Sequence, residues 1–146
     1  MALIFFLLIF FAELSENNSM EMFRYLRAQS GESVTVPCFY DLEYKHHVKY
    51  WCKGFTRSSC TVMARSDSTQ AEGKMSVTDD PAHLVILVTM RDLQVKDTDW
   101  YWCGAEISGA VDDSACLYLN VVSGKMMIHF YDFMTNISDF LKPQST

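Results

Sequence analysis

In Leu93-Gln-Val-Lys-Asp97-Thr-Asp-Trp-Tyr101-Trp-Cys103, an Asp lies four residues before a Tyr, and a Cys lies two residues after that Tyr. This order is typical of a corner in a β-sandwich, where the Tyr hydroxyl bonds back to the backbone and the Cys faces the opposite sheet. Asp97 needs a cation at such a corner, because a half-buried carboxylate is costly when it is unpaired. Lys74 is the best-placed candidate, since it starts an expected strand just before the segment that leads into the corner.

Two upstream residues extend the pattern of this corner. Cys38 ends an apolar run with a period of two, after Val34 and Val36, so its side chain points into the same interior as Cys103. Trp51 follows thirteen residues later on a second strand-like run. The order Cys, Trp, Cys resembles the signature of immunoglobulin domains.

The chain contains eight or nine short strand-like segments, the ninth being a minor edge strand within 65–73, and no helical stripe before residue 124. We expect an all-β, two-sheet, immunoglobulin-like sandwich of the variable (V-set) type with Greek-key connections. The stretch between Trp51 and Lys74 is long enough for the extra strand pair of that type. Alternation from Trp51 also sends Lys49 inward, and we expect its ammonium group to snorkel past the end of its strand. The expected strands cover residues 22–29, 34–39, 48–53, 60–64, 74–78, 83–90, 99–105 and 115–122, with a turn at 79–81.

The chain begins with eleven apolar residues, 2–12, which are followed by Glu13. This length suits a secretory signal peptide and is short of the roughly 20 apolar residues that a membrane-spanning helix needs. The alternative is a buried helix of the mature fold. We divide the chain into a signal peptide at 1–19, with cleavage between 12 and 22, a domain at 20–122 and a tail at 123–146. The tail is either poorly ordered or a short amphipathic helix.

Cysteine usage and net charge narrow the function classes. Five cysteines behind a signal peptide favour an oxidising compartment and a disulfide framework with one cysteine left over. We expect no metal site, because the nearest pair, Cys52 and Cys60, lacks Cys-x-x-Cys spacing. A formal net charge of −6 argues against a nucleic-acid partner. The available Ser, His and Asp residues have no recognisable catalytic spacing, so we expect neither an enzyme nor a cofactor.

Four segments carry a resemblance to a receptor family. They are Val48-Lys-Tyr-Trp-Cys52-Lys, a second Cys at 60, Thr78-Asp-Asp-Pro81, and the stretch 93–103 followed by Gly104. Over residues 22–122 they resemble the variable-type domains of the polymeric immunoglobulin receptor and of the CMRF-like single-domain myeloid receptors. The resemblance implies the disulfides Cys38–Cys103 and Cys52–Cys60. It also implies a cell-surface recognition domain with binding loops at one end, in a family whose members bind immunoglobulin or anionic and zwitterionic lipids.

Two departures from that family concern the corner and the location of the protein. Lys74 stands where Arg is usual, and we expect no membrane span or cytoplasmic tail of a signalling receptor within residues 1–146. We expect the extracellular side of the plasma membrane for a full-length receptor, or secretion if this chain is complete. Asn17 and Asn136 begin acceptor sequons for N-glycosylation, and Asn136 is the more accessible of the two.

A basic interval of the sequence suggests the sign of the ligand. Between Glu43 and Asp67 there is no acid, so we expect one end and edge of the domain to carry a positive field. We predict an anionic ligand, such as a phospholipid, and the alternative is a solvated basic face that balances acids elsewhere. An immunoglobulin-binding or transport receptor fragment and a secreted adhesive dimer are the competing functions. The bases of this interval are Lys45, Lys49, Lys53, Arg57 and Arg65 with His46 and His47. Asp112 and Asp113, in the loop before the last strand, could contribute to a cation site, but they offer only two of the six or so oxygen ligands that Ca²⁺ takes.

Cys116 is the cysteine that we expect to remain unpaired. It alternates with Leu117, whose burial sends Cys116 to the outer face of the sheet. Cys52 also faces outward, but the strand of Cys103 lies between the two in a variable-type sheet and separates them by roughly 9–10 Å, beyond the limit for a disulfide. A thiol exposed in an oxidising compartment is capped or bridges two chains, which would make a homodimer. The alternative is that Tyr118 or the tail covers the thiol and keeps it inert.

Overall fold

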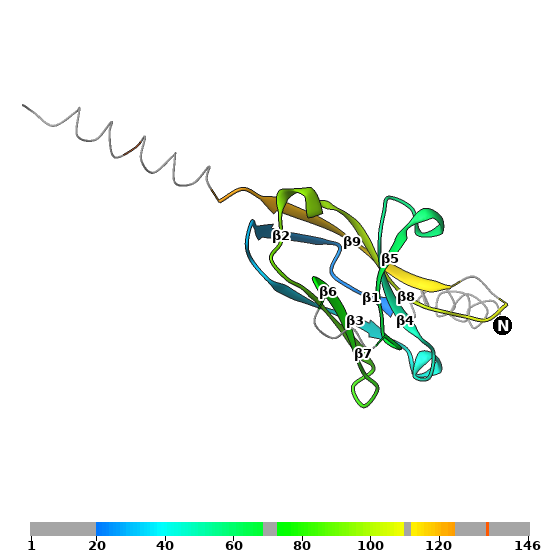
Figure 1. Cartoon of the computed structure of the whole chain (residues 1–146). Helices are drawn as coiled ribbons and strands as arrows, with labels where there is room; N and C mark the ends of the chain where they lie inside the picture. The colour runs from blue at the N-terminus through cyan, green and yellow to red at the C-terminus, as the bar shows by residue number, and fades with distance from the viewer. Residues whose placement is uncertain (1–19, 69–72, 110–111, 125–133, 135–146) are drawn as a thin grey trace, which may run out of the picture.

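The structure is a computed structural model that describes residues 20–68, 73–109, 112–124 and 134. Within these residues the chain forms nine strands and three short 3-10 helices, arranged as two packed sheets (Figure 1). The predicted signal peptide, the sequons at Asn17 and Asn136 and most of the predicted tail lie outside the described residues. None of the helices in the described part is long and apolar enough to cross a membrane.

The two sheets confirm the predicted all-β sandwich. One sheet contains β1 (Met20–Glu21), β3 (Val34–Tyr40), β7 (Val85–Met90) and β6 (Met75–Asp80), in that spatial order. The other contains β2 (Tyr25–Gln29), β9 (Asp113–Val122), β8 (Asp99–Ala105), β4 (Lys49–Lys53) and β5 (Thr61–Arg65), also in spatial order. The short helices are η1 (Leu42–Tyr44), η2 (Arg57–Ser59) and η3 (Val95–Asp97).

The prediction of a single first strand over 22–29 is wrong. Only residues 25–29 of this segment form a strand, β2, which pairs parallel with β9, while the separate strand β1 precedes the segment and pairs antiparallel with β3. The chain crosses from the edge of one sheet to the edge of the other at residues 22–24. Because packed sheets lie about 10 Å apart, a segment that borders both of them must break between them. As a result, β2 accompanies β9 only from Tyr118 onward.

The prediction that Lys49 snorkels to water is also wrong. Lys49 is fully buried, and its ammonium group donates to Asp79 Oδ2 at 2.8 Å and to the carbonyl of Lys45 at 3.0 Å. The same group lies 4.1 Å from the centroid of the Tyr40 ring, and the Tyr40 hydroxyl donates to Asp79 Oδ1 at 2.7 Å. The predicted turn at 79–81 is displaced, because β6 continues to Asp80 and carries Asp79 into position beside Lys49. The charge is therefore neutralised inside the sandwich.

The core is centred on one disulfide that joins the two sheets. The structure joins Cys38 of β3 to Cys103 of β8 with a Cα separation of 6.7 Å. Trp51 of β4 stacks on Tyr101 of β8, with ring centroids 5.4 Å apart and planes 12° apart. All four side chains are inaccessible to solvent. The aliphatic core around them includes Val36, Ile86, Val88, Met90, Leu93, Leu117, Leu119 and Val121.

The corner before β8 is held by two side chains. The Tyr101 hydroxyl donates to the carbonyl of Asp97 at 2.7 Å, and the Asp97 carboxylate accepts from Lys74 at 2.6 Å and from the Gln94 N–H at 2.7 Å. Burial raises the pKa of Asp97, but the hydrogen bonds from Lys74 and Gln94 outweigh it and hold the pKa below the ordinary value. Burial and the nearby charge of Asp97 raise the pKa of Tyr101, so its hydroxyl stays a donor.

We expect Asp97→Asn to lower the free energy of unfolding by about 1–3 kcal/mol near neutral pH, because it removes the charged acceptor of Lys74. The wild-type domain should lose stability as the pH falls below about 4, the ordinary pKa of Asp, since the depressed folded-state pKa means that the unfolded chain takes up the proton first. In Asp97→Asn this acid-dependent loss should be shallower.

Urea unfolding at a series of pH values measures both effects. The control is Asp41→Asn, which changes an exposed carboxylate far from the corner and should leave stability and pH slope nearly unchanged. An Asp97→Asn variant with wild-type stability and a wild-type pH slope would contradict the role assigned to this corner.

Candidate ligand-binding site at the loop end

Three connections meet at one end of the sandwich, which we call the loop end. They are residues 41–48 between β3 and β4, residues 66–68 after β5, and residues 106–112 between β8 and β9, of which 110–111 lie outside the described part. The strand register brings them together: Lys49 lies opposite Ala105, and Ala105 lies opposite Asp113. The β4–β5 ladder ends at the same place.

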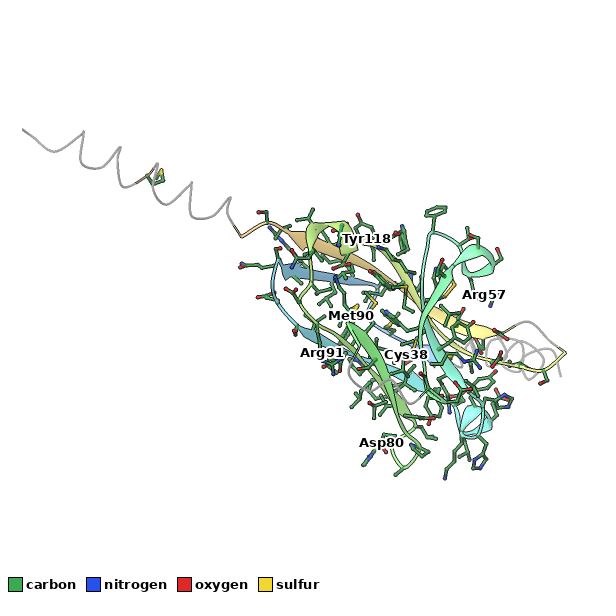
Figure 2. The ribbon with its side chains drawn as sticks, in the orientation of Figure 1. Cys38, Arg57, Asp80, Met90, Arg91 and Tyr118 are labelled. Carbon is green, nitrogen blue, oxygen red and sulfur yellow. A yellow bond between two sulfur atoms is a disulfide. The ribbon has the colours of Figure 1, made fainter. Side chains whose placement is uncertain are left out.

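Asp112 organises the third of these connections. Its Oδ1 accepts from the N–H of Ile107 and its Oδ2 from the Tyr50 hydroxyl, both at 3.0 Å. Its carbonyl accepts from the guanidinium of Arg57, which η2 carries toward this connection (Figure 2). Gly104 lies opposite Tyr50, and a Cβ there would fall 2.3 Å from Tyr50 Cζ, so only glycine allows the ring this close. Burial and the hydrogen bond to Asp112 raise the pKa of Tyr50.

Two further bonds tie the first connection to the third. The Tyr44 hydroxyl donates to Asp113 Oδ2 at 3.1 Å. His47 Nδ1 lies 2.8 Å from the carbonyl oxygen of Glu106, and since a carbonyl only accepts, this nitrogen carries the proton. The rings of Tyr44 and His47 meet edge to face with centroids 5.7 Å apart. His47 therefore anchors the loop end rather than standing open to a ligand.

Arg65 ties the second connection to the third. Its guanidinium donates to both carboxylate oxygens of Asp67, at 2.9 and 3.2 Å, and to Glu106 Oε2 at 2.9 Å. These bonds raise the pKa of Arg65, and the bond from Arg65 lowers the pKa of Asp67. Arg65 and the buried Lys49 are thus neutralised within the fold, and the positive field is weaker than predicted. The basic interval lacks acids in sequence but not in space, because Glu106 arrives from the third connection and Asp79 from β6.

Lys45, which is half-buried, and His46, which is exposed, are bases of the loop end that have no carboxylate partner among the described residues. Leu42 lies in the same connection with 68% of its surface exposed, so this connection exposes an apolar side chain as well as the two bases. Asp41 and Glu43 are exposed there as well, and they limit the net positive charge of the connection.

The geometry does not support Asp112 and Asp113 as open ligands for a cation. Both oxygens of the Asp112 carboxylate accept hydrogen bonds from the chain itself. Asp113 Oδ2 accepts from Tyr44, and its Oδ1 accepts from the N–H of Ser114 at 2.8 Å. In the described part of the chain, no group of three or more His, Cys, Asp and Glu residues is placed to hold a metal ion.

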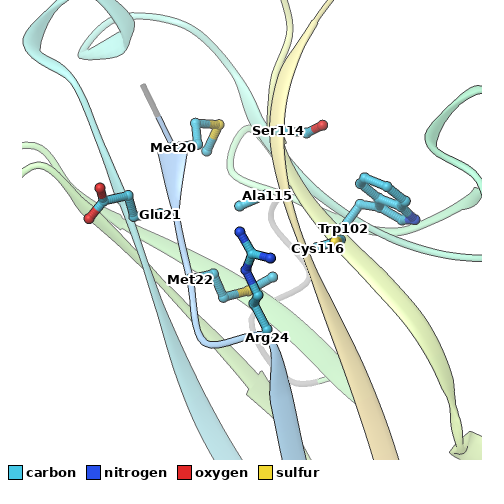
Figure 3. A pocket seen from close by; sticks show the side chains of 8 residues that line it. All are labelled: Met20, Glu21, Met22, Arg24, Trp102, Ser114, Ala115 and Cys116. Atoms are coloured by element: carbon cyan, nitrogen blue, oxygen red, sulfur yellow. The ribbon is translucent and has the colours of Figure 1, made fainter. Parts of the chain in front are cut away.

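The remaining cysteines lie on the five-stranded sheet or, for Cys60, directly before its strand β5. Cys52 bonds to Cys60 with a Cα separation of 5.5 Å. Cys116 is unpaired and half-buried, on the outward face of β9 opposite Trp102 of β8. A depression of about 440 Å³ lies beside it, where the chain crosses between the sheets, and Figure 3 shows Arg24 and Trp102 among its lining residues.

Several residues of the loop end have no signature in the sequence. Tyr44, Tyr50 and Glu106 were not among the candidate residues, although each bridges two connections or a strand and a connection. Alternation with the inward Trp51 indicates that Tyr50 points outward. Its partner, Asp112, depends on the conformation of a loop, and no local pattern specifies that.

The family model for immunoglobulin V-set domains matches residues 22–122. The chain belongs to the immunoglobulin V-set family. This membership confirms the variable type predicted from the sequence, and domains of this receptor family are in general non-enzymatic.

Relatives and solved structures confirm the predicted resemblance to both receptor groups. CMRF35-like molecule 9 of Mus musculus is 40% identical over 99 residues, which cover 65% of this V-set chain and 30% of the relative. Transmembrane domain-containing protein TMIGD3 of Mus musculus is 37% identical over 82 residues, which cover 56% of the chain and 37% of the relative. The crystal structure of a teleost fish polymeric Ig receptor ectodomain matches with a TM-score of 0.66 and 40% identity, over 70% of this chain and 50% of that one. The V-set chain therefore spans half or less of each of these proteins.

We expect Tyr50→Phe to loosen the third connection, because it removes one of the two hydrogen bonds that hold the Asp112 carboxylate. The free energy of unfolding should fall by about 1 kcal/mol. Amide hydrogen exchange at Ile107, whose N–H donates to the same carboxylate, should become several-fold faster, in line with a local opening free energy lowered by that amount.

Tyr25→Phe is the matched control, since it removes an exposed hydroxyl on β2. It should leave exchange at Ile107 unchanged. Equal exchange at Ile107 in wild type and Tyr50→Phe would show that Tyr50 does not hold this connection.

Proposed function

We propose that this chain is the extracellular ligand-recognition domain of an immune cell-surface receptor, that it is not an enzyme, and that its loop end binds an anionic ligand such as a phospholipid headgroup. The observation that carries the proposal is the cross-linked loop end, where Tyr44, Tyr50 and Arg65 hold three connections as one surface. V-type domains use this end for binding. Similarity to a protein named for its transmembrane domain and to a receptor ectodomain supports the extracellular location.

The chemistry of the first connection supports an anionic lipid surface. The half-buried Lys45 and the exposed His46 lie in the same connection as the exposed Leu42, so this connection offers positive charge to headgroups and an apolar side chain to the membrane interface. Asp41 and Glu43 oppose this attraction, so the binding should be modest and sensitive to salt. The formal net charge of −6 makes a nucleic-acid partner unfavourable.

Co-flotation with vesicles tests the proposal. The soluble domain should bind vesicles that contain phosphatidylserine more tightly than vesicles of phosphatidylcholine alone. Lys45→Glu should weaken binding to the anionic vesicles by about tenfold or more, since each Lys or Arg near such a surface contributes about 1 kcal/mol and the substitution reverses the charge. Added salt should weaken the binding of the wild-type domain.

Lys96→Glu is the matched control, because it makes the same charge change at an exposed position in η3, at the corner next to Asp97. It should leave vesicle binding nearly unchanged. Equal vesicle binding by wild type and Lys45→Glu would overturn the lipid proposal. Binding to immunoglobulin in that case would favour an immunoglobulin-binding fragment.

A covalent homodimer through Cys116 is the second candidate, as in a secreted adhesive module. The half-buried, unpaired thiol on an outward sheet face favours it. Two Cys116 thiols would react with a small-molecule disulfide: one thiolate attacks it and releases one thiol, and the second thiolate then displaces the other, which leaves one S–S bond between the chains and two small thiols.

The wild-type protein, oxidised with such a disulfide, should run as a dimer on a non-reducing gel and as a monomer after reduction. Cys116→Ser should run as a monomer in both lanes. A wild-type protein that stays monomeric under oxidation would exclude the covalent dimer.

A further inference from the structure

The depression beside Cys116 lies along the part of β9 that has a strand partner on one side only. β8 pairs with β9 from Asp113 to Leu119, whereas β2 begins to pair with it at Tyr118. The strand β1, which also borders the depression, pairs with β3 of the other sheet. The depression has a volume of about 440 Å³, which is within the roughly 300–1,000 Å³ of small-molecule sites.

The backbone of Cys116 is open toward this depression. The Tyr118 N–H donates to the carbonyl of Arg24, so it points away from β8. Backbone groups alternate in direction along a strand, so the N–H and C=O of Cys116, two residues earlier, point the same way. β2 does not reach this position, and no backbone hydrogen bond joins Cys116 to a described residue on that side. One donor and one acceptor therefore remain for a ligand with a peptide group.

Arg24 supplies a positive charge at the same place. Its side chain is exposed, and its guanidinium has no ion-pair partner in the described part of the chain. Figure 3 shows this side chain extending into the depression toward Ala115, while the Glu21 carboxylate points away from Arg24. Guanidinium groups bind carboxylates through two parallel hydrogen bonds. The charge is thus available to an acidic ligand.

Two further residues give the depression a wall and a reactive group. The indole N–H of Trp102 donates to the carbonyl of Gly54 at 2.9 Å, which fixes the ring. Cys116 lies opposite Trp102 in the ladder, and its thiol is half-buried and unpaired. The thiol, the open backbone of Cys116 and the Arg24 guanidinium therefore border one cavity. They match three parts of one ligand, which are a sulfur atom, a peptide group and a carboxylate.

We propose that the depression binds a short acidic peptide disulfide, of the class of oxidised glutathione, and that this ligand caps Cys116. The Cys116 thiolate attacks one sulfur of the ligand, the S–S bond of the ligand breaks, and a new S–S bond joins Cys116 to one half of it. The other half leaves as a thiolate and takes up a proton from water. The ligand is itself the oxidant. In the bound half, a carboxylate pairs with Arg24 and a peptide group bonds to the backbone of Cys116.

Capping of Cys116 does not depend on the loop end, but it competes with the covalent dimer. A mixed disulfide is also the first intermediate on the route to the dimer, where a second Cys116 displaces the cap. Contacts that hold the cap in the depression slow this displacement. An acidic peptide disulfide therefore favours the capped monomer, whereas a small disulfide without these groups leaves the route to the dimer open.

Capping rates, followed as the mass increase of the intact protein at low protein concentration, test the site. The reagents are oxidised glutathione, dithiodipropionate, which has carboxylates but no peptide group, and the neutral bis(hydroxyethyl) disulfide. Each rate is divided by the rate with the urea-unfolded chain, its disulfides intact, which removes the intrinsic reactivity of the reagent. The normalised rate of oxidised glutathione should exceed that of the neutral disulfide about tenfold, and that of dithiodipropionate about threefold, as hydrogen bonds to charged and to neutral groups predict.

Arg24→Gln should lower the normalised rate of oxidised glutathione about tenfold and leave that of the neutral disulfide unchanged. Arg27→Gln is the matched control, because Arg27 is exposed on β2 opposite Asn120. That position is about 13 Å along β9 from Cys116, so screening should keep its effect below about twofold. Cys116→Ser should show no mass increase with any of the reagents.

Binding without the covalent bond is measured with Cys116→Ser and S-methylglutathione, which cannot form a disulfide. This reagent should slow amide hydrogen exchange at residue 116, and Arg24→Gln should remove the effect. Unchanged exchange at residue 116, or wild-type capping rates in Arg24→Gln, would overturn the site. Equal normalised rates for oxidised glutathione and dithiodipropionate would overturn the peptide class of the ligand. Vesicle binding depends on Lys45 at the loop end, so it reports on the recognition proposal independently of these outcomes.

Discussion

The disulfide between Cys38 and Cys103 joins the two sheets at the centre of the core, and closing a loop of 65 residues in this way contributes about 4 kcal/mol in the chain-entropy model. Trp51 and Tyr101 stack beside it without exposed surface. With these side chains inward, strand alternation forces Tyr50 on β4 and the outer aromatic residues on β8 to face the solvent. The inward packing around this disulfide therefore determines which side chains point toward the loop end and which point out from the five-stranded sheet.

At the end of the core nearest the loop end, Lys49 is buried in an ion pair with Asp79. Burial of Lys49 and Asp79 costs desolvation energy that their attraction roughly offsets, so the pair contributes little net stability. Its contribution is geometric. The Lys49 ammonium bonds to β6 through Asp79 and to the first connection through the Lys45 carbonyl, which links both sheets and the base of the candidate site. A loop next to this buried charge has fewer ways to move than a loop over an apolar core.

The two candidate surfaces differ in their chemistry. At the loop end most polar groups bond to one another, as Arg65 does with Glu106 and Tyr50 with Asp112, which makes the surface stiff and leaves few charges for a ligand. The outward face of the five-stranded sheet exposes rings such as Phe55 and has Arg24 beside Cys116 and Trp102. The first suits a ligand attracted by a small number of groups in a fixed arrangement.

The sequence by itself determined the sandwich class, the inward residues of the strands and the outward direction of Cys116, because alternation with a period of two is a local property that the corner motif places in register. The pairing of Lys74 with Asp97 follows from the same motif. Only the tertiary structure decided that the first strand breaks between two sheets, that Lys49 meets Asp79, and that Glu106 neutralises Arg65. The two ion pairs join residues 30 and 41 positions apart through sheet register and loop conformation, and the energy of each contact depends on neighbours that no local pattern specifies.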